Sequence, residues 1–511
     1  MTDQATRTRP SSIVVALLLI LFCGTILLER LHTYDEPLER DVATYAVIAR
    51  EMRHGRALYS DLWDNKPPLL YVIFGAAQLL AGDGAGSVFL IGLFCAIATA
   101  LALYAAGARA GGTAAGLAAA AAWALLSGDL ALQANQPNIE ALLNVALTAG
   151  FAALLGAGVR VFDRRIVAAA LCLTMAALLK PVVAPVVIAL VAGHLARPPD
   201  GVSRARASLQ SAVILGLCAA ACAAVAGYFY VTGRWGDTWR TLVVHNQYYA
   251  GPLLPNLREG ARPTRLFPAA LHDAWPLVAA ALPGLALGIG RRWPRPALLL
   301  MAWLVAVPVV VAAPGKFFAH YYQLWLPPLC LAAGWSIAAV AARTSSPRRV
   351  AGAAAATLCA VLGIEVGPSY ARPAADWSEA KYGDVFLRAR DVAGDARAML
   401  APGETFFQWG NEPELYLYVP RAPPTGVLWA QYLQYGPMRL ELRNRALEQL
   451  SLADPQLVVF SRDQPPPTGA LGQWFKERYE LHPLLHRRAG FSFWVRRGGS
   501  LQRRLLNAGG A

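Results

Sequence analysis

The chain has 511 residues, of which 56% are hydrophobic and only 15% are charged, and its mean hydropathy is +0.39. This composition excludes an ordinary soluble globule, and it is typical of a protein that crosses a membrane many times. The formal net charge is +14, but basic loops beside membrane segments produce such an excess without any nucleic-acid partner. We therefore expect membrane lipids, and no nucleic acid, among its partners.

Apolar segments recur along the chain as far as Val366. Crossing the hydrocarbon layer takes about 20 mainly apolar residues. The segments that meet or approach this length are Ile13 to Leu28, Pro68 to Leu80, Ser87 to Ala106, Thr113 to Leu126, Ile139 to Gly156, Ile166 to Leu179, Val182 to Ala196, Leu209 to Tyr230, Ala274 to Ile289, Ala297 to Val311, Tyr321 to Ala342 and Val350 to Ile364. The first follows Arg7 and Arg9 but precedes no small-residue cleavage site, which predicts an uncleaved anchor.

If each of these twelve segments crossed the membrane, the chain would cross twelve times, but the distribution of arginine corrects this number. Four short loops are basic, and they contain Arg160, Arg164 and Arg165; Arg197, Arg204 and Arg206; Arg291, Arg292 and Arg295; and Arg343, Arg348 and Arg349. Lys and Arg prefer cytoplasmic loops, but with an inner N-terminus and every segment crossing, all four loops would lie outside. One segment must therefore fail to cross, and the short run from Pro68 to Leu80 is the best candidate. We expect about 11 crossings, within a range of about 11 to 13.

This topology places the polar segments on the outer face. They are Glu29 to Pro67, Ser127 to Asn138, Lys180, Val231 to Asp273, Ala312 to His320 and the tail after Gly367. The predicted transmembrane domain covers residues 1–366, with its first external loop at residues 29–67. All cysteines lie in apolar segments, so no disulfide framework and no cysteine metal site is indicated.

The tail from residue 376 to 511 reads as a separate, water-soluble α/β domain of about 130 residues. Its periodicity predicts helices near Asp384 to Leu400 and Arg439 to Leu450, and strands at "TFFQWG", "LVVF" and "FSFWV". The motif "GNEPELYLY" (Gly410 to Tyr418) predicts a surface turn with a packed aromatic stripe, and a binding role is the alternative.

The first external loop contains a short helical pattern. Tyr45, Ile48, Ala49 and Met52 recur at helical spacing, while the charged residues between them point elsewhere. This predicts an amphipathic helix that lies on the membrane surface or against the helical bundle. Asp41 stands just ahead of it, where its carboxylate could cap the helix, act chemically, or do both.

Further charged groups surround this helix. Asp35, Glu36, Glu39, Asp61 and Asp64 are, taken singly, expected to be solvated loop charges. Lys66 differs because it stands directly before Pro67, Pro68 and the apolar run that follows. At this position a lysine either snorkels to the membrane interface or holds a phosphate at headgroup depth.

The segment "ERDVATYAVIAREMRHGRALYSDLWDNKPPLLY" (Glu39 to Tyr71) resembles the first external loop of the membrane glycosyltransferases of family 39. This family includes protein O-mannosyltransferases and lipid A aminoarabinose transferases. The resemblance extends in order to "NQPNIE" (Asn135 to Glu140), to Lys180 in "LLKP", to "VVHNQYY" (Val243 to Tyr249) and to "KFFAHYYQLWLPP" (Lys316 to Pro328). It implies a GT-C-like fold.

The resemblance also implies an activity, namely transfer of a sugar from a polyprenyl-phosphate carrier to an acceptor on the outer face of a bacterial inner membrane. The acceptor would be a hydroxyl or phosphate of a lipid, glycan or protein. The pattern places the general base at Asp41, where Val42 follows instead of the second acid of many relatives, so Asp35 and Glu36 stay open as alternatives. Lys66, Lys180 and Arg40 are the expected partners of the donor phosphate, and backside attack would invert the anomeric carbon without a second carboxylate.

Four more polar residues are candidates on the outer face: Asn135, Glu140, His245 and His320. Glu140 begins an apolar helix, where an acid is favourable beside the helix dipole or serves the site. The two histidines could bind a divalent metal together with a glutamate, but interfacial packing or acceptor contacts explain them better. No cofactor is required by the proposed chemistry.

Two other classes of protein compete with this interpretation. A flippase or transporter of lipid-linked sugars would also be polytopic and basic, but it would usually show internal repeats and ionisable groups at mid-membrane. A non-catalytic membrane receptor would explain the outer domain but not the acids, lysine and prolines gathered at the lipid interface.

Overall fold

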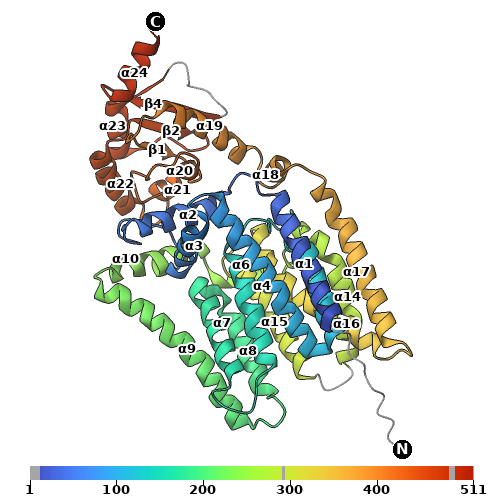
Figure 1. The fold of residues 1–511 in the computed structure, drawn as a ribbon. Coiled ribbons are helices and arrows are strands. Elements are labelled where there is room, and N and C mark those ends of the chain that lie inside the picture. The colour runs from blue at the N-terminus through green and yellow to red at the C-terminus, as the bar shows by residue number, and fades with distance from the viewer. Residues whose placement is uncertain (1–11, 290–293, 483–489, 510–511) are drawn as a thin grey trace, which may run out of the picture. The chain divides into compact units, whose positions relative to one another are not determined.

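A computed structural model describes residues 12–289, 294–482 and 490–509 of the chain (Figure 1). Arg7, Arg9, Arg291 and Arg292, which entered the topology argument, lie outside these residues. The chain divides into two compact units, each built from several stretches of sequence. Unit 1 comprises Met1–Tyr34, Ile91–Val225 and Gly251–Pro373, and unit 2 comprises Asp35–Leu90, Ala226–Ala250 and Ala374–Ala511.

Unit 1 is helical, and many of its helices run side by side (Figure 1). Its elements are α1 (Ser12–His32), most of α4 (Ala85–Gly111), α5 (Thr113–Leu126), α6 (Ile139–Leu155), α7 (Arg164–Leu179), η1 (Pro181–Val183), α8 (Ala184–Ala196), most of α9 (Arg204–Val231), α12 (Leu253–Gly260), α13 (Pro263–Leu266), η3 (Ala269–Ala274), α14 (Trp275–Ile289), α15 (Arg295–Ala312), η4 (Ala319–Trp325), α16 (Leu326–Ala341) and α17 (Pro347–Tyr370). They follow the predicted apolar segments closely, because long apolar runs without interior breakers form helices in lipid.

Six of the described helices are long and apolar enough to cross a membrane: Ser12–His32, Ala85–Gly111, Arg204–Val231, Arg295–Ala312, Ala319–Ala341 and Pro347–Tyr370. Shorter apolar helices accompany them, among them α3 (Pro68–Ala81), which has 14 residues. At a rise of about 1.5 Å per residue, such a helix spans about 21 Å of a hydrocarbon layer about 30 Å thick. This length agrees with the prediction that the segment does not cross completely, and the number of crossings stays a prediction.

Unit 2 combines the first external loop with the C-terminal residues. Besides α3 it contains α2 (Arg40–Arg53), α10 (Trp235–Trp239), η2 (Arg240–His245), α11 (Asn246–Ala250), α18 (Ala374–Tyr382), α19 (Val385–Met399), β1 (Phe406–Trp409), α20 (Leu415–Tyr418), α21 (Ala430–Gln434), α22 (Arg439–Ala453), β2 (Leu457–Ser461), α23 (Gly469–Arg478), β3 (Tyr479–Leu481), β4 (Phe491–Arg496) and α24 (Ser500–Gly509). The α/β character predicted for the tail is confirmed.

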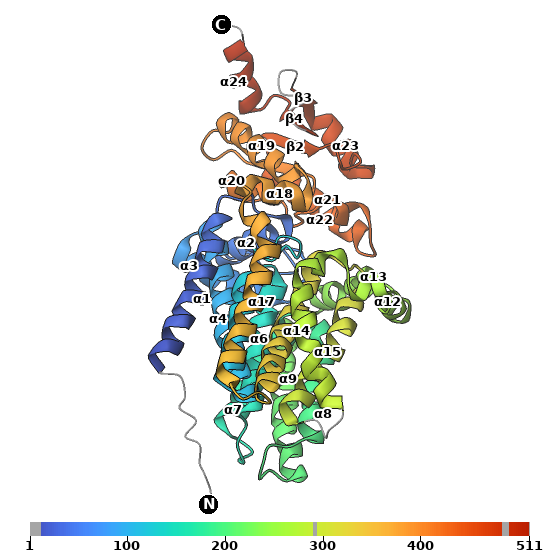
Figure 2. The same ribbon diagram turned by 90° about the vertical axis from the view of Figure 1, so that its right-hand side faces the viewer.

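The strands form one mixed sheet in the order β1-β2-β4-β3, and Figure 2 labels β2, β4 and β3 of this sheet. β1 pairs parallel with β2, so that Phe406 lies opposite Leu457, and β4 pairs antiparallel with both β2 and β3. Alternate side chains point to opposite faces of a strand. Phe407 and Trp409 therefore share one face, where they pack with the buried apolar residues of α22 and α23.

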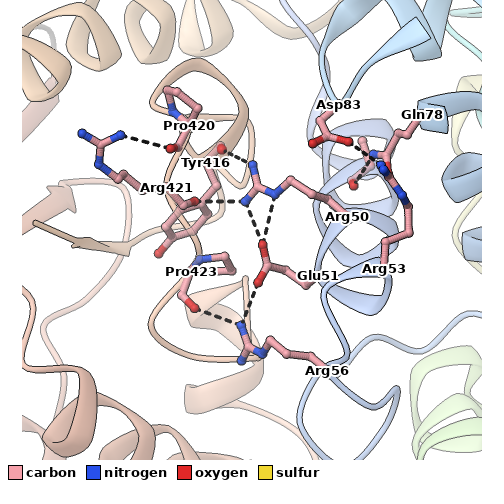
Figure 3. A network of polar contacts seen from close by, with 11 residues as sticks. Arg50, Glu51, Arg53, Arg56, Gln78, Asp83, Tyr416, Pro420, Arg421 and Pro423 are labelled. Atoms are coloured by element: carbon pink, nitrogen blue, oxygen red, sulfur yellow. Dashed lines mark hydrogen bonds and ion pairs between the residues drawn. The ribbon is translucent and has the colours of Figure 1, made fainter. Parts of the chain in front are cut away.

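The helix α2 corrects one part of the expectation for this amphipathic helix, namely that its charged residues point away from packed protein. Its residues from Val42 to Glu51 are all buried, including the charged pair Arg50 and Glu51. Arg50 donates to the carbonyl oxygens of Tyr416 at 2.9 Å and Arg421 at 3.0 Å (Figure 3). The polar side of the helix thus faces protein, because the C-terminal part of unit 2 supplies hydrogen-bond acceptors that the local sequence does not show.

Glu51 balances two arginines in this network. Its Oε1 accepts from Arg50 Nε at 3.0 Å, and its Oε2 lies 3.5 Å from Arg56 Nη1 (Figure 3). Arg56 also donates to the carbonyl oxygen of Pro423 at 3.0 Å. These bonds tie α2 to residues 416–423, so the compact unit extends beyond the tail domain that we predicted at residues 376–511.

Replacing Glu51 should therefore destabilise unit 2. Glu51→Gln keeps the side-chain shape but leaves the buried Arg50 and the half-buried Arg56 without a counter-charge, and we expect a loss of about 3 kcal/mol. The measurement is thermal or denaturant unfolding of the purified protein. The matched control is Asp83→Asn, which breaks the exposed Arg53–Asp83 pair and should cost less than about 1 kcal/mol. Equal losses in the two variants would contradict the role given to Glu51.

Candidate functional site

The motif "DNKPP" forms a polar cluster in unit 2. Asp64 is only 5% exposed, and its Oδ2 accepts from the hydroxyl of Tyr71 at 2.6 Å. Lys66 Nζ donates to Asn65 Oδ1 at 2.7 Å, and the Tyr59 hydroxyl donates to the Lys66 carbonyl oxygen at 2.8 Å. The two prolines that follow fix the chain direction at the start of α3. Asp64 is therefore a buried, bonded group and not the solvated loop charge that we expected.

Two carboxylates keep Lys66 charged. Burial by itself lowers the pKa of Lys66, but the carboxylates of Asp64 and Asp41 raise it, and the net shift is upward. Burial also raises the pKa of Asp64, while the Lys66 ammonium acts in the opposite direction. The cluster thus holds a permanent cation at the end of the first external loop.

Asp41 is the second residue of α2, and it does not cap the helix. The N-cap is Glu39, whose side chain accepts from the backbone N–H groups of Asp41 at 3.0 Å and Val42 at 2.8 Å. The capping interpretation of Asp41 is wrong, because the helix begins at Arg40, one residue before it. Asp41 is half-buried, and among the described residues no side chain or backbone group donates a hydrogen bond to its carboxylate. That carboxylate is consequently available to another partner.

The two alternative acids differ from Asp41. Glu36 is buried and forms an ion pair with Lys381, with 2.5 Å between Oε1 and Nζ. Asp35 is exposed, and its backbone carbonyl accepts from Arg390 at 2.9 Å. The paired Glu36 would have to give up a buried partner before it could accept a proton from a substrate.

Arg40 lies against two aromatic rings. Its guanidinium carbon is 5.5 Å from the ring centroid of Phe386 and 5.8 Å from that of Trp429. Such contacts orient a guanidinium without neutralising it. Within the described residues, Arg40 forms no ion pair with a carboxylate.

The tail contributes buried acids that we did not predict. In "GNEPELYLY", Glu412 and Glu414 are buried, so this motif is not the surface turn that we expected. Burial raises the pKa of Glu412 to about 7, although Arg40 lowers it. Burial likewise raises the pKa of Glu39 to about 8, with Asp41 adding to the shift. The motif was visible in the sequence, but only the fold brings its acids into the electrostatic range of Arg40 and Glu39.

His245 joins the cluster from "VVHNQYY". It is 3% exposed, and its ring packs against those of Trp63 at 4.9 Å and Tyr432 at 5.5 Å. Burial and the charge of Lys66 lower its pKa to about 4, so the imidazole is neutral at pH 7. Within the described residues neither ring nitrogen has a hydrogen-bond partner. Asn246 connects the same segment to the first loop by donating to the carbonyl oxygen of Asn65 at 3.0 Å.

A second polar cluster lies in unit 1. Lys180 caps the C-terminal end of α7, and Glu140 lies in the first turn of α6 after the N-cap Asn138. Lys180 Nζ is 2.5 Å from Glu140 Oε1, and the Glu140 side chain is fully buried. The ammonium group also lies 4.0 Å from the ring centroid of Tyr321. Glu140 thus does more than stabilise the helix dipole, because it holds the lysine in place.

Asn135 and His320 belong to the same unit. Asn135 is buried in the loop before α6, and His320 Nδ1 lies 3.4 Å from Oε1 of Gln133 in that loop. The ring of His320 packs against Tyr321 at 4.8 Å. His245 and His320 occur in different units, and neither belongs to the group of three metal-ligating side chains found among the described residues.

Unit 1 also contains an apolar cavity of about 860 Å³. Its lining comes from the segment before α14, from α14 and α15, and from Trp325 and Leu329. Trp325 ends η4, the short helix that also carries His320 and Tyr321. A long hydrocarbon chain fits the size and polarity of such a cavity.

Comparison with known proteins bears on the fold. A scan against protein-family models found no match, and neither did a search of curated proteins. Among solved structures, ArnT from Cupriavidus metallidurans in the apo state is 16% identical, with a TM-score of 0.64 over 95% of this chain and 98% of that chain. ArnT bound to undecaprenyl phosphate gives 17% identity and a TM-score of 0.58, over 96% of this chain and 99% of that chain.

A third structure is more distant. The archaeal oligosaccharyltransferase AglB from Archaeoglobus fulgidus, in complex with an inhibitory peptide and a dolichol-phosphate, is 14% identical. Its TM-score is 0.51, over 88% of this chain and 69% of that chain.

This chain has the fold of these proteins. The likeness to ArnT extends over nearly the whole of both chains. The predicted GT-C-like architecture, a polytopic helical part with a small C-terminal α/β domain, is thereby confirmed. Together with its six long apolar helices, the fold identifies an integral membrane protein.

Proposed function

We propose that the chain is a glycosyltransferase that moves a sugar from a polyprenyl-phosphate carrier to an acceptor on the outer face of the bacterial inner membrane. The observation that carries this proposal is the half-buried carboxylate of Asp41. It does not cap α2, and its charge raises the pKa of Lys66. A base beside a cation fits a reaction in which a hydroxyl loses a proton while a lipid phosphate leaves.

The solved relatives support the donor class. One ArnT structure contains undecaprenyl phosphate, and the AglB structure contains dolichol-phosphate and an inhibitory peptide. Carriers of this kind combine an anionic phosphate with a long apolar chain. Lys66 in unit 2 and Lys180 in unit 1 are separate candidate partners of the phosphate, and Arg40 would contribute a positive charge near the base. The apolar cavity of unit 1 suits the hydrocarbon chain of such a carrier.

The proposed step needs few groups. The acceptor oxygen attacks the anomeric carbon from the face opposite the phosphate, and the bond from that carbon to the phosphate oxygen breaks. The acceptor proton passes to a carboxylate oxygen of Asp41, and the polyprenyl phosphate leaves as an anion held by the lysines. One displacement inverts the anomeric configuration, so no nucleophilic carboxylate is required. The sugar and the chemical class of the acceptor, a lipid, glycan or protein, follow from other contacts.

The first prediction concerns Asp41. Because Glu39 caps α2, Asp41→Asn should fold and insert normally, while the amide cannot accept a proton at neutral pH. Transfer to acceptor should fall by about 10² or more, with donor binding retained. The measurement is transfer from a radiolabelled polyprenyl-phosphate sugar in purified protein or membranes.

The matched control for this experiment is Asp35→Asn, an exposed acid of the same loop. Its transfer rate should stay within about twofold of wild type. Near-normal transfer by Asp41→Asn would exclude Asp41 as the base, and a large loss in Asp35→Asn alone would assign the role to Asp35. Transport of the intact donor without any transfer or hydrolysis would favour a flippase instead.

The second prediction concerns the two lysines. Lys66→Met and Lys180→Met should each weaken binding of polyprenyl phosphate by about tenfold or more, because each removes a cation from the phosphate site. Since Lys180→Met also strands the buried Glu140, the double variant Lys180→Met with Glu140→Gln separates lost binding from lost stability. The control is Lys476→Met, at an exposed position. Unchanged affinity in both single variants would contradict the assignment.

The third prediction concerns sidedness. A cysteine at the exposed Ser203, in a basic loop, should react with an impermeant maleimide only from the inside of the membrane. A cysteine at the exposed Glu379 in α18 should react only from the outside. The experiment is labelling of intact cells against inverted vesicles. The opposite pattern at either position would remove the common outer face that the mechanism requires.

A further inference from the structure

Three metal-ligating side chains converge in unit 1, apart from every residue used above. His272 and Asp273 come from η3, and Glu365 comes from α17. His272 Nδ1 lies 3.2 Å from Asp273 Oδ1 and 3.8 Å from Glu365 Oε2. One ligand atom of each residue lies within 4.8 Å of the others. This spacing suits three ligands around one ion, with bonds of about 2.0 to 2.2 Å.

The charges of this group are not balanced by protein cations. Within the described residues, neither Asp273 nor Glu365 forms an ion pair with a lysine or arginine, and both side chains are largely buried, at 20% and 22% exposure. The indole N–H of Trp275 donates to Glu365 Oε1 at 2.9 Å. This bond orients the carboxylate and leaves Oε2 directed at His272, which is the arrangement that metal-binding carboxylates adopt.

A further carboxylate borders this group of ligands. Asp129, in the turn after α5, is 1% exposed, and its Oδ1 accepts from the backbone N–H of Leu132 at 2.7 Å. Within the described residues its Oδ2 has no hydrogen-bond partner, although that oxygen is buried. The Asp273 carboxylate is the nearby charge, and it adds to the rise in the pKa of Asp129 that burial causes. Asp129 thus brings a buried carboxylate oxygen without a donor to the edge of the ligand group, and a cation bound to Asp273 would compensate both carboxylates.

We propose that His272, Asp273 and Glu365 bind one divalent first-row metal ion, Zn²⁺ or Mn²⁺. Asp129 would not contact the ion itself, but would orient Asp273 or a water molecule bound to the metal. An imidazole nitrogen combined with carboxylate oxygens favours these ions over Mg²⁺ and Ca²⁺, which prefer oxygen ligands alone. Asp129 lies outside the group of three ligands, which is why it receives the outer position.

The ion would join parts of the chain that are distant in sequence. It would connect η3, directly before α14, with the C-terminal turns of α17, beside the turn that contains Asp129. His272 also lines the apolar cavity of unit 1. A bound ion would therefore fix the edge of that cavity. This role does not depend on the proposed transfer reaction.

The test uses the full chain without a polyhistidine tag, purified in detergent, treated with EDTA and desalted. The protein is incubated with Zn²⁺ or Mn²⁺, unbound metal is removed, and the retained metal is measured by mass spectrometry. We expect one equivalent per chain for at least one of the two ions. Asp273→Asn and Glu365→Gln should weaken its binding by at least about tenfold, and Asp129→Asn by about 10- to 100-fold.

The control is His54→Gln, an exposed histidine in unit 2, which should retain the metal. The proposal is overturned if wild-type protein retains no more of either ion than the EDTA-treated sample. In that case Asp129 and Asp273 share a proton, and no metal ion is needed to compensate their charge. It is also overturned if Asp273→Asn and Glu365→Gln keep the affinity while His245→Gln loses it. Melting curves recorded without metal verify that the Asn and Gln variants, which keep side-chain volume, remain folded.

Discussion

The cost of burying charge governs the structure of unit 2. The first external loop is rich in charged residues, and Glu36, Glu39, Arg50, Glu51 and Asp64 are buried inside the unit, where water does not screen them. A buried charge is tolerated only where an opposite charge or hydrogen bonds compensate it. Arg50 with Glu51, Glu36 with Lys381 and Lys66 with Asp64 all follow this rule. The loop is thus a part of the packed unit and not a surface appendage.

The same constraint singles out the groups suited to chemistry. Because these buried charges have partners inside the protein, the groups with unused capacity stand out. Asp41 is one, because Glu39 has taken the capping role. Arg40 is another, because aromatic rings and not carboxylates hold its guanidinium. In unit 1 the Lys180–Glu140 pair is compensated already, so an anionic ligand there would share or displace an existing partner.

Much of the fold follows from sequence periodicity. Thr113 to Leu126 was predicted with the bounds of α5, and Ile139 to Gly156 ends one residue after α6. Long apolar runs leave few alternatives, because a helix satisfies its own backbone groups in lipid. The strands β1, β2 and β4 were also predicted, whereas β3 was missed because its three residues are too few for a periodic pattern. The helix α2 was located correctly, but the burial of its charged residues was not predicted, since no local pattern announces the acceptors at Tyr416 and Arg421.

The sequence by itself determined the membrane architecture, the α/β tail and the short list of polar residues from which a site could be built. These follow from local spacing and composition, which act over one or two turns of a helix. Tertiary structure alone decided which of those residues are buried and which meet: that Asp64 is buried, that Arg50 reaches the carbonyl oxygen of Tyr416, and that Asp129 lies beside Asp273. The physical reason is that desolvation and pairing depend on partners more than a hundred positions away, and only the folded chain brings such partners into contact.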